Sequence, residues 1–183
     1  MPNRREFLQA SGLSLAYAVG AQTLSLSPAQ AYAKQLPYKR LSKAEAATLE
    51  LLADSIVPGA RTAGVAHYLD AQLAATAEDC LLMIKYLGVP SPYDSFYQAA
   101  LQAADQLSQS EYKKPWPELS DTQREALTDQ IASGAVTDWQ GPPAGFFFFV
   151  LRADASDVVY GTERGHAAID FPHMAHIKPV QEW

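Results

Sequence analysis

The residues GFFFFVLRADASDVVY, from Gly145 to Tyr160, decide the fold class of this 183-residue chain. Four consecutive phenylalanines followed by Val150 and Leu151 are compatible with a buried strand or a buried helix, because so short an apolar run has no distinguishing periodicity. A strand needs a partner, and no second strand candidate is evident elsewhere in the sequence. We therefore predict a helix that continues to about Tyr160, and with it an all-α fold.

Capping signals predict where the other helices begin. Ser42-Lys43-Ala44-Glu45 has the pattern of a capping box, in which the side chains of Ser42 and Glu45 each accept a backbone N–H of the other residue. Similar boxes begin at Thr76, Ser91 and Ser120. Apolar residues follow each box at helical spacing, and a further helix is expected at residues 65–75. The sequence predicts one small domain of five to six helices, followed from Gly161 by an extended C-terminal tail.

Charge and cysteine content exclude several functions. The chain has 14 Lys and Arg residues against 20 Asp and Glu residues, and its net charge at pH 7 is −6. An acidic domain without a basic block is a poor partner for nucleic acid, so we expect none to bind. The single cysteine, Cys80, cannot form an internal disulfide, and the Cys-x-x-Cys-His motif of c-type haem attachment is absent.

The first 33 residues have the features of an export signal. Arg4 and Arg5 form a basic start, Phe7 and Leu8 follow them, and a weakly apolar stretch extends to about residue 26. The arrangement resembles a twin-arginine signal, which exports proteins that have already folded.

Two small-x-small triplets, Ala29-Gln30-Ala31 and Ala31-Tyr32-Ala33, are candidate signal-peptidase sites. We expect cleavage after Ala33, which divides the chain into a twin-arginine signal peptide at 1–33 and a helical small-subunit domain at 34–183. The alternative is an uncleaved leader that is retained as a membrane anchor.

The histidines do not form a recognisable metal site in the sequence. They are His67, His166, His173 and His176. No pattern of Cys, Asp or Glu ligands accompanies them, so we expect them to bond to backbone groups instead.

Other residues with chemical potential also have simpler interpretations. Asp54, Asp70, Asp154 and Asp157 are expected to be solvated acids on helix surfaces. Cys80 is expected to be a small buried hydrophobe. The phenylalanine run is expected to lie in the core, with a docking face for a partner as the alternative. The sequence contains no nucleophile elbow, phosphate loop or dinucleotide fingerprint, so we predict no catalytic, cofactor-binding or metal-binding residue in this chain.

Several short motifs occur in the order found in one family of small subunits. They are LSKAEAATL at 41–49, LADSIVPG at 52–59, TAGV at 62–65, YLD at 68–70, VYGT at 159–162 and FPHMAHI at 171–177. With Pro179 and Trp183 at the end, the sequence resembles the gluconate 2-dehydrogenase subunit 3 family over nearly all of the expected domain. One difference is that many members have Tyr-Gly-Gly-Asn where this chain has Tyr160-Gly161-Thr162-Glu163.

The resemblance implies a non-catalytic role. Such subunits accompany a large flavoprotein of the glucose–methanol–choline oxidoreductase type, which holds FAD and oxidises a sugar, sugar acid or polyol. A cytochrome c that carries haem often accepts the electrons. The flavoprotein often lacks its own signal, so the small subunit would carry it through the twin-arginine translocase to the periplasm and stabilise it there.

We expect the partner to contact the C-terminal tail, at Phe171, His173, His176 and Trp183. Two alternatives to the subunit role are a stand-alone periplasmic protein that binds a metal through its histidines, and a helical interaction protein of another complex.

Overall fold

The computed structural model describes residues 15–19 and 22–170. In chain order the elements are β1 (Leu15–Val19), β2 (Gln22–Leu26), α2 (Pro28–Ala33), α3 (Lys43–Ile56), α4 (Ala60–Ala63), α5 (Val65–Leu73), α6 (Met83–Tyr86), α7 (Asp94–Tyr112), the 3₁₀-helix η1 (Trp116–Glu118), α8 (Asp121–Ser133), α9 (Ala144–Tyr160) and α10 (Glu163–Ala168).

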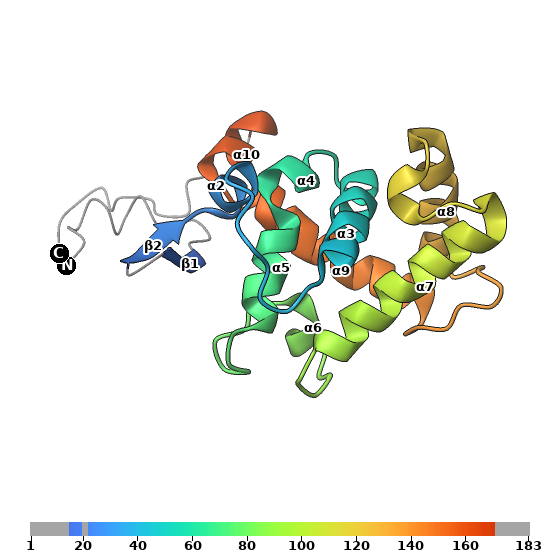
Figure 1. Ribbon diagram of the computed structural model, residues 1–183, viewed down its shortest axis with the longest axis horizontal. Helices are drawn as coiled ribbons and strands as arrows, with labels where there is room; N and C mark the ends of the chain where they lie inside the picture. The colour runs from blue at the N-terminus through green and yellow to red at the C-terminus, as the bar shows by residue number, and fades with distance from the viewer. Residues whose placement is uncertain (1–14, 20–21, 171–183) are drawn as a thin grey trace.

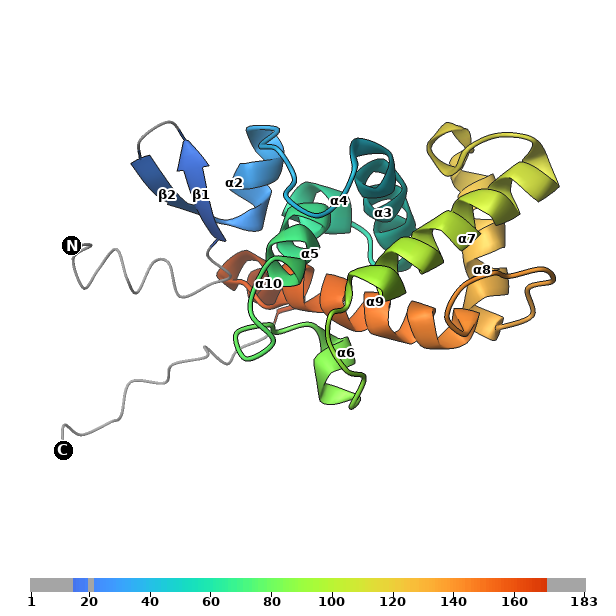
Figure 2. The same ribbon diagram turned by 60° about the horizontal axis from the view of Figure 1, so that its bottom comes forward.

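The domain is all-α, as predicted. Nine α-helices lie within the described residues, more than the five or six expected, because the short helices α2, α4 and α10 were not predicted. β1 and β2 form an unexpected antiparallel hairpin in which Leu15 lies opposite Leu26. Figures 1 and 2 place this hairpin at one end of the molecule, next to α2. None of the helices in the described part of the chain is long and apolar enough to span a bilayer.

α9 is the central helix of the domain. It contacts α3, α4, α5, α6, α7, α8 and α10. Figure 2 shows α9 along the length of the domain, with α3, α4 and α5 on one side of it and α6 on the other. Every other long helix therefore buries part of its surface against this one.

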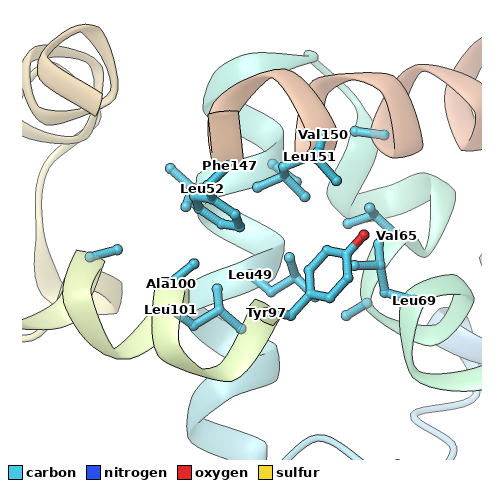
Figure 3. Packing of buried hydrophobic residues seen from close by; sticks show 14 of the residues in the cluster. Leu49, Leu52, Val65, Leu69, Tyr97, Ala100, Leu101, Phe147, Val150 and Leu151 are labelled. Atoms are coloured by element: carbon cyan, nitrogen blue, oxygen red, sulfur yellow. The ribbon is translucent and has the colours of Figure 1, made fainter. Parts of the chain in front are cut away.

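The core explains why the phenylalanine run is helical. Phe147, Val150 and Leu151 of α9 point toward apolar side chains of α3, α5 and α7 (Figure 3). The buried residues at positions 147, 150, 151, 154, 155 and 158 recur at helical spacing and form one face. The predicted helix from Phe146 to about Tyr160 is confirmed.

Two of the predicted capping boxes are confirmed. Ser42 and Glu45 exchange hydrogen bonds at the start of α3, at 2.7 and 3.2 Å. Ser120 and Gln123 do the same at the start of α8. Ser27 and Gln30 form a third box, at the start of α2, which was not predicted.

Three predictions about local structure are wrong. Ser91 does not cap α7, which begins at Asp94 without a side-chain cap after Tyr93. The Asp94 carboxylate binds Arg40 instead.

Thr76 does bond to Asp79, but those residues form a turn and α6 is confined to Met83–Tyr86. The chain after Gly161 is not wholly extended, because Thr162 caps the helix α10 through its hydroxyl. The rest of the expected tail, residues 171–183, lies outside the described residues.

Candidate functional site

The sequence-predicted site residues lie at the two ends of the chain. Arg4, Arg5, Phe7 and Leu8 precede the described residues. Phe171, His173, His176 and Trp183 follow them, so neither group can be placed in the structure.

His67 has the structural role that we expected of the histidines. It is buried in α5, and its Nε2 lies 3.0 Å from the backbone oxygen of Leu36. The ring of Tyr38 lies 4.6 Å from the His67 ring, and that of Tyr32 6.5 Å. His166 lies on α10. Within the described residues, no group of three or more His, Cys, Asp or Glu side chains is placed to bind a metal ion.

Asp154 is the most deeply buried acid, with no exposed surface. The backbone N–H of Met83 donates to its Oδ1 at 2.8 Å, and the Tyr97 hydroxyl donates to its Oδ2 at 2.6 Å. Met83 is the first residue of α6, whose N-terminus has no side-chain cap of its own. The carboxylate therefore caps α6 from a distant helix and holds α6, α7 and α9 together.

Burial raises the pKa of Asp154 from 3.8 to about 6, because the surrounding protein disfavours the charged carboxylate. The hydrogen bonds from Met83 and Tyr97 act in the opposite direction and lower this pKa, whereas the charge of Asp157 raises it. Burial also raises the pKa of Tyr97 well above its ordinary value, so its hydroxyl remains a proton donor. Both oxygens of Asp154 are thus occupied by donors that belong to the fold.

Asp70 is a second buried acid with a comparable role. Its carboxylate accepts the consecutive backbone N–H groups of Lys39, Arg40 and Leu41, at 2.7 to 3.0 Å. Consecutive amides that converge on one anion form a local concavity of positive potential. Because Ser42 follows directly, Asp70 fixes the chain where it enters α3.

Two further aspartates cap short helices in the same way. Asp54 of α3 accepts the N–H groups of Gly59 and Arg61 at the start of α4, both at 3.0 Å. Asp105 of α7 accepts the N–H of Trp116, the first residue of η1, at 2.8 Å. These aspartates use their carboxylates to satisfy backbone groups that the short helices leave unpaired.

The prediction of solvated surface acids is therefore wrong for Asp70 and Asp154. Asp157 is exposed as predicted, although partial burial raises its pKa, and Asp54 is partly exposed and binds the start of α4. The sequence contains a signal for the burial of Asp154. Asp154 lies on the same helical face as Val150, Leu151 and Val158, so a helix there necessarily directs its carboxylate into the core.

Cys80 is buried, as predicted. Burial raises the pKa of the Cys80 thiol, which reduces the thiolate available for nucleophilic chemistry.

One depression on the described surface is open to solvent and has a volume of about 440 Å³. Arg40 and Asp94 line it and bind each other through two hydrogen bonds, Nε to Oδ1 at 2.8 Å and Nη2 to Oδ2 at 3.0 Å. This pair joins the segment before α3 to the start of α7. Arg40 and Asp94 neutralise each other, and Lys39 adds a further positive charge to the lining.

Exposed apolar side chains gather near α6. Leu81, Tyr86 and Leu87, which belong to or flank this helix, expose 49%, 64% and 41% of their surfaces. α6 projects from the domain beside α9 (Figure 2). Phe149 of α9 exposes 41% of its surface. The guanidinium of Arg152 lies 6.0 Å from the Phe149 ring. We call these residues, Leu81, Tyr86, Leu87 and Phe149, the α6–α9 apolar set.

The expectation that the phenylalanine run lies in the core is therefore partly correct, and the docking-face alternative stays a prediction. Phe147 is completely buried, Phe146 and Phe148 are partly buried, and Phe149 is 41% exposed. One side of the same helix forms the core while the other presents an apolar ring to solvent.

Comparison with known proteins identifies the family. Nothing matches the chain among curated proteins or among solved structures. A family model described as gluconate 2-dehydrogenase subunit 3 matches residues 43–172, which extend from the first residue of α3 to beyond α10 and make up more than half of the chain. The chain therefore belongs to the gluconate 2-dehydrogenase subunit 3 family.

Proposed function

We propose that this chain is the non-catalytic small subunit of a periplasmic dehydrogenase complex, in which a separate flavoprotein holds FAD and oxidises a sugar, sugar acid or polyol. The observation that carries the proposal is the family match over residues 43–172, since that family is described as a dehydrogenase subunit. A cytochrome c with bound haem would accept electrons where the complex has a third subunit.

The uses of the buried acids support this role. Asp70 and Asp154 bind backbone and tyrosine donors that position helices, rather than facing a shared cavity. Asp54 likewise serves the start of α4. The most chemically capable side chains in the described part of the chain thus stabilise the fold.

The α6–α9 apolar set is the proposed docking surface for the flavoprotein. Exposed apolar residues concentrated on neighbouring elements are typical of interaction sites. Interfaces also favour aromatic residues and arginine, which Tyr86, Phe149 and Arg152 provide. Phe171, His173, His176 and Trp183 of the tail are the proposed additional contacts.

Export is the second part of the proposal. Arg4, Arg5, Phe7 and Leu8 would address the chain to the twin-arginine translocase. A flavoprotein must fold around FAD before it crosses the membrane, so a folded complex could cross on the signal of its small subunit.

The export role is tested by the double substitution Arg4→Lys and Arg5→Lys in cells that also produce the flavoprotein. We expect the flavoprotein and its bound FAD to remain in the cytoplasm, as measured by immunodetection and by flavin fluorescence of each fraction. Normal arrival of the flavoprotein in the periplasm would refute the carrier role.

The docking role is tested with Tyr86→Glu and Leu87→Glu, each of which introduces a charge into the α6–α9 apolar set. We expect either variant to lose co-purification of the flavoprotein. Gln102→Glu is a matched control, because Gln102 is exposed on α7 and lies outside this set. If the docking variants and the control co-purify equally, the proposed surface is incorrect. Trp183→Ala tests the tail and should weaken assembly by about 1 kcal/mol or more.

A further inference from the structure

We propose that α2 is a permanent part of the folded domain, so that signal peptidase does not cut after Ala31 or Ala33 and the exported chain keeps residues 28–33. Both candidate triplets lie in or overlap this helix (Pro28–Ala33). A protease needs its substrate segment accessible and locally unfolded, so the question depends on how firmly α2 is held.

α2 has its own stabilising cap. Ser27 accepts the backbone N–H of Gln30, and the Gln30 side chain accepts the N–H of Ser27 at 2.9 Å. At the other end, the N–H of Lys34 donates to Gln30 and that of Leu36 donates to Ala31. The backbone around both cleavage sites is therefore hydrogen-bonded in a helical conformation.

The contact between α2 and the domain is close enough to require glycine. A Cβ atom at Gly64 would lie 2.1 Å from the backbone oxygen of Pro28, which is a severe overlap. Gly64 connects α4 and α5 with a φ of 85°. The N-terminus of α2 thus lies directly against the backbone of the junction between these helices.

Apolar burial adds a second point of attachment. Ala31 has no exposed surface and forms a small cluster with Leu15, against which Leu26, Leu36 and Ala71 pack. Ala71 belongs to α5, so this cluster joins the hairpin, α2 and the domain. Ala31 is the residue that both triplets share, and it is the least accessible of them.

The chain immediately after α2 is also fixed. The backbone oxygen of Leu36 lies 3.0 Å from Nε2 of His67, and the Tyr38 hydroxyl donates to Glu50 at 2.8 Å. The Asp70 carboxylate binds the backbone of residues 39–41. Unfolding of the triplets would therefore have to occur between two anchored segments.

The inference rests on the proposed export route, because only a chain that crosses in the folded state meets signal peptidase with α2 already in place. A chain threaded through the membrane unfolded would present the same triplets in accessible form.

The first test is the intact mass and N-terminal sequence of the chain isolated from the periplasm with its complex. A chain that begins at or before Pro28 supports the proposal. Any N-terminus after Pro28, and in particular Tyr32 or Lys34, overturns it.

The second test examines α2 without depending on export. The unprocessed full-length chain is purified from the cytoplasm of the Arg4→Lys, Arg5→Lys strain, and the variants Ala31→Cys and Ala33→Cys are labelled with a maleimide. Ala33 is exposed, so we expect Ala31→Cys to react more than about tenfold more slowly, because its labelling requires local opening. The parent chain, whose cysteine is the buried Cys80, gives the background rate of maleimide labelling. Equal rates would overturn the proposal whatever the export route.

Hydrogen exchange in the same chain provides a readout that needs no new cysteine. We expect the amides of Ala31 and Lys34 to be protected, and Gly64→Ala to abolish this protection. Gly88→Ala is the matched control, since Gly88 has a similar φ of 74° but nothing within 4 Å of its would-be Cβ. If the parent amides exchange without protection, α2 is not part of the folded domain and the proposal fails.

Discussion

Substitution of Asp154 by asparagine should remove a specific pH dependence from the stability of this domain. The pKa of Asp154 is raised by burial from 3.8 to about 6. The folded protein therefore retains a proton between about pH 4 and 6 that the unfolded chain has released. This proton stabilises the folded state below pH 4, and its contribution is lost as the pH rises through 6.

The magnitude follows from the size of the pKa change. A rise from 3.8 to about 6, at about 1.4 kcal/mol per pH unit, corresponds to about 3 kcal/mol. Asparagine does not titrate, but its carbonyl can still accept the N–H of Met83 and its amide can donate to the Tyr97 oxygen. Part of this change lies below pH 4, so we expect the stability of wild type relative to Asp154→Asn to fall by about 2 kcal/mol between pH 4 and 7. At pH 7.5 the variant should be at least as stable as wild type.

The assay is urea unfolding followed by tryptophan fluorescence, repeated at intervals from pH 4 to 7.5. The buried Trp116 is a suitable reporter. All other groups titrate in both proteins, so the difference between the two curves isolates Asp154. Asp121→Asn removes an exposed carboxylate and is the control.

A difference that stays constant over this pH range would refute the reasoning, and so would one that increases as the pH rises. Either result would mean that the burial of Asp154 does not govern its protonation. Asp154→Ala provides a further check, because it leaves the Met83 N–H and the Tyr97 hydroxyl without an acceptor. That variant should be less stable than Asp154→Asn at every pH.

Three further predictions concern stability and can be measured by the same urea unfolding. Phe147→Ala should cost about 3–5 kcal/mol because Phe147 is completely buried, whereas Phe149→Ala on the same helix should cost less than about 1 kcal/mol; equal costs would contradict the assigned faces of α9. Asp70→Ala should cost about 3 kcal/mol, since it removes the acceptor for three backbone N–H groups; a negligible loss would show that water replaces the carboxylate. Ser120→Ala should cost about 1 kcal/mol, but Ser91→Ala should stay within about 0.5 kcal/mol because Ser91 caps no helix, and a larger effect at Ser91 would disagree with the observed start of α7.

Local signals predicted the long helices well. The capping boxes at Ser42 and Ser120 join residues three apart, and their hydrogen bonds form as the pattern suggests. The Phe146–Tyr160 helix was inferred from the lack of a strand partner, and the buried face at 147, 150, 151, 154, 155 and 158 confirms it. These features depend on neighbours along the chain, which a sequence displays directly.

The starts of α6 and η1 could not be predicted because their caps come from distant parts of the chain. α6 begins where Asp154, 71 positions away, accepts the Met83 N–H. η1 begins where Asp105 accepts the backbone N–H of Trp116, 11 positions away. Neither start has a local signature, and the box expected at Ser91 fails because Asp94 binds Arg40, 54 positions away.

The functional predictions also divide into those that the sequence alone supports and those that needed the structure. The resemblance to the family came from motifs that are legible in the sequence, and the family match confirms it. The expected export and tail contacts fall outside the described residues and stay predictions. The α6–α9 apolar set could not be foreseen, because leucine and tyrosine also occur in the core. Only the fold leaves Leu81 and Tyr86 uncovered.

By itself, the sequence determined the all-α class, the long helices and the family, because helical periodicity, capping pairs and motif order are properties of residues close together along the chain. Only the tertiary structure decided which partners the buried acids bind, where α6 and η1 begin and which apolar residues stay exposed. Those outcomes depend on desolvation and on hydrogen-bond partners brought together from distant positions. Asp154 illustrates the division: its place on an apolar helical face is visible in the sequence, but its raised pKa and its two partners exist only after α6, α7 and α9 have packed together.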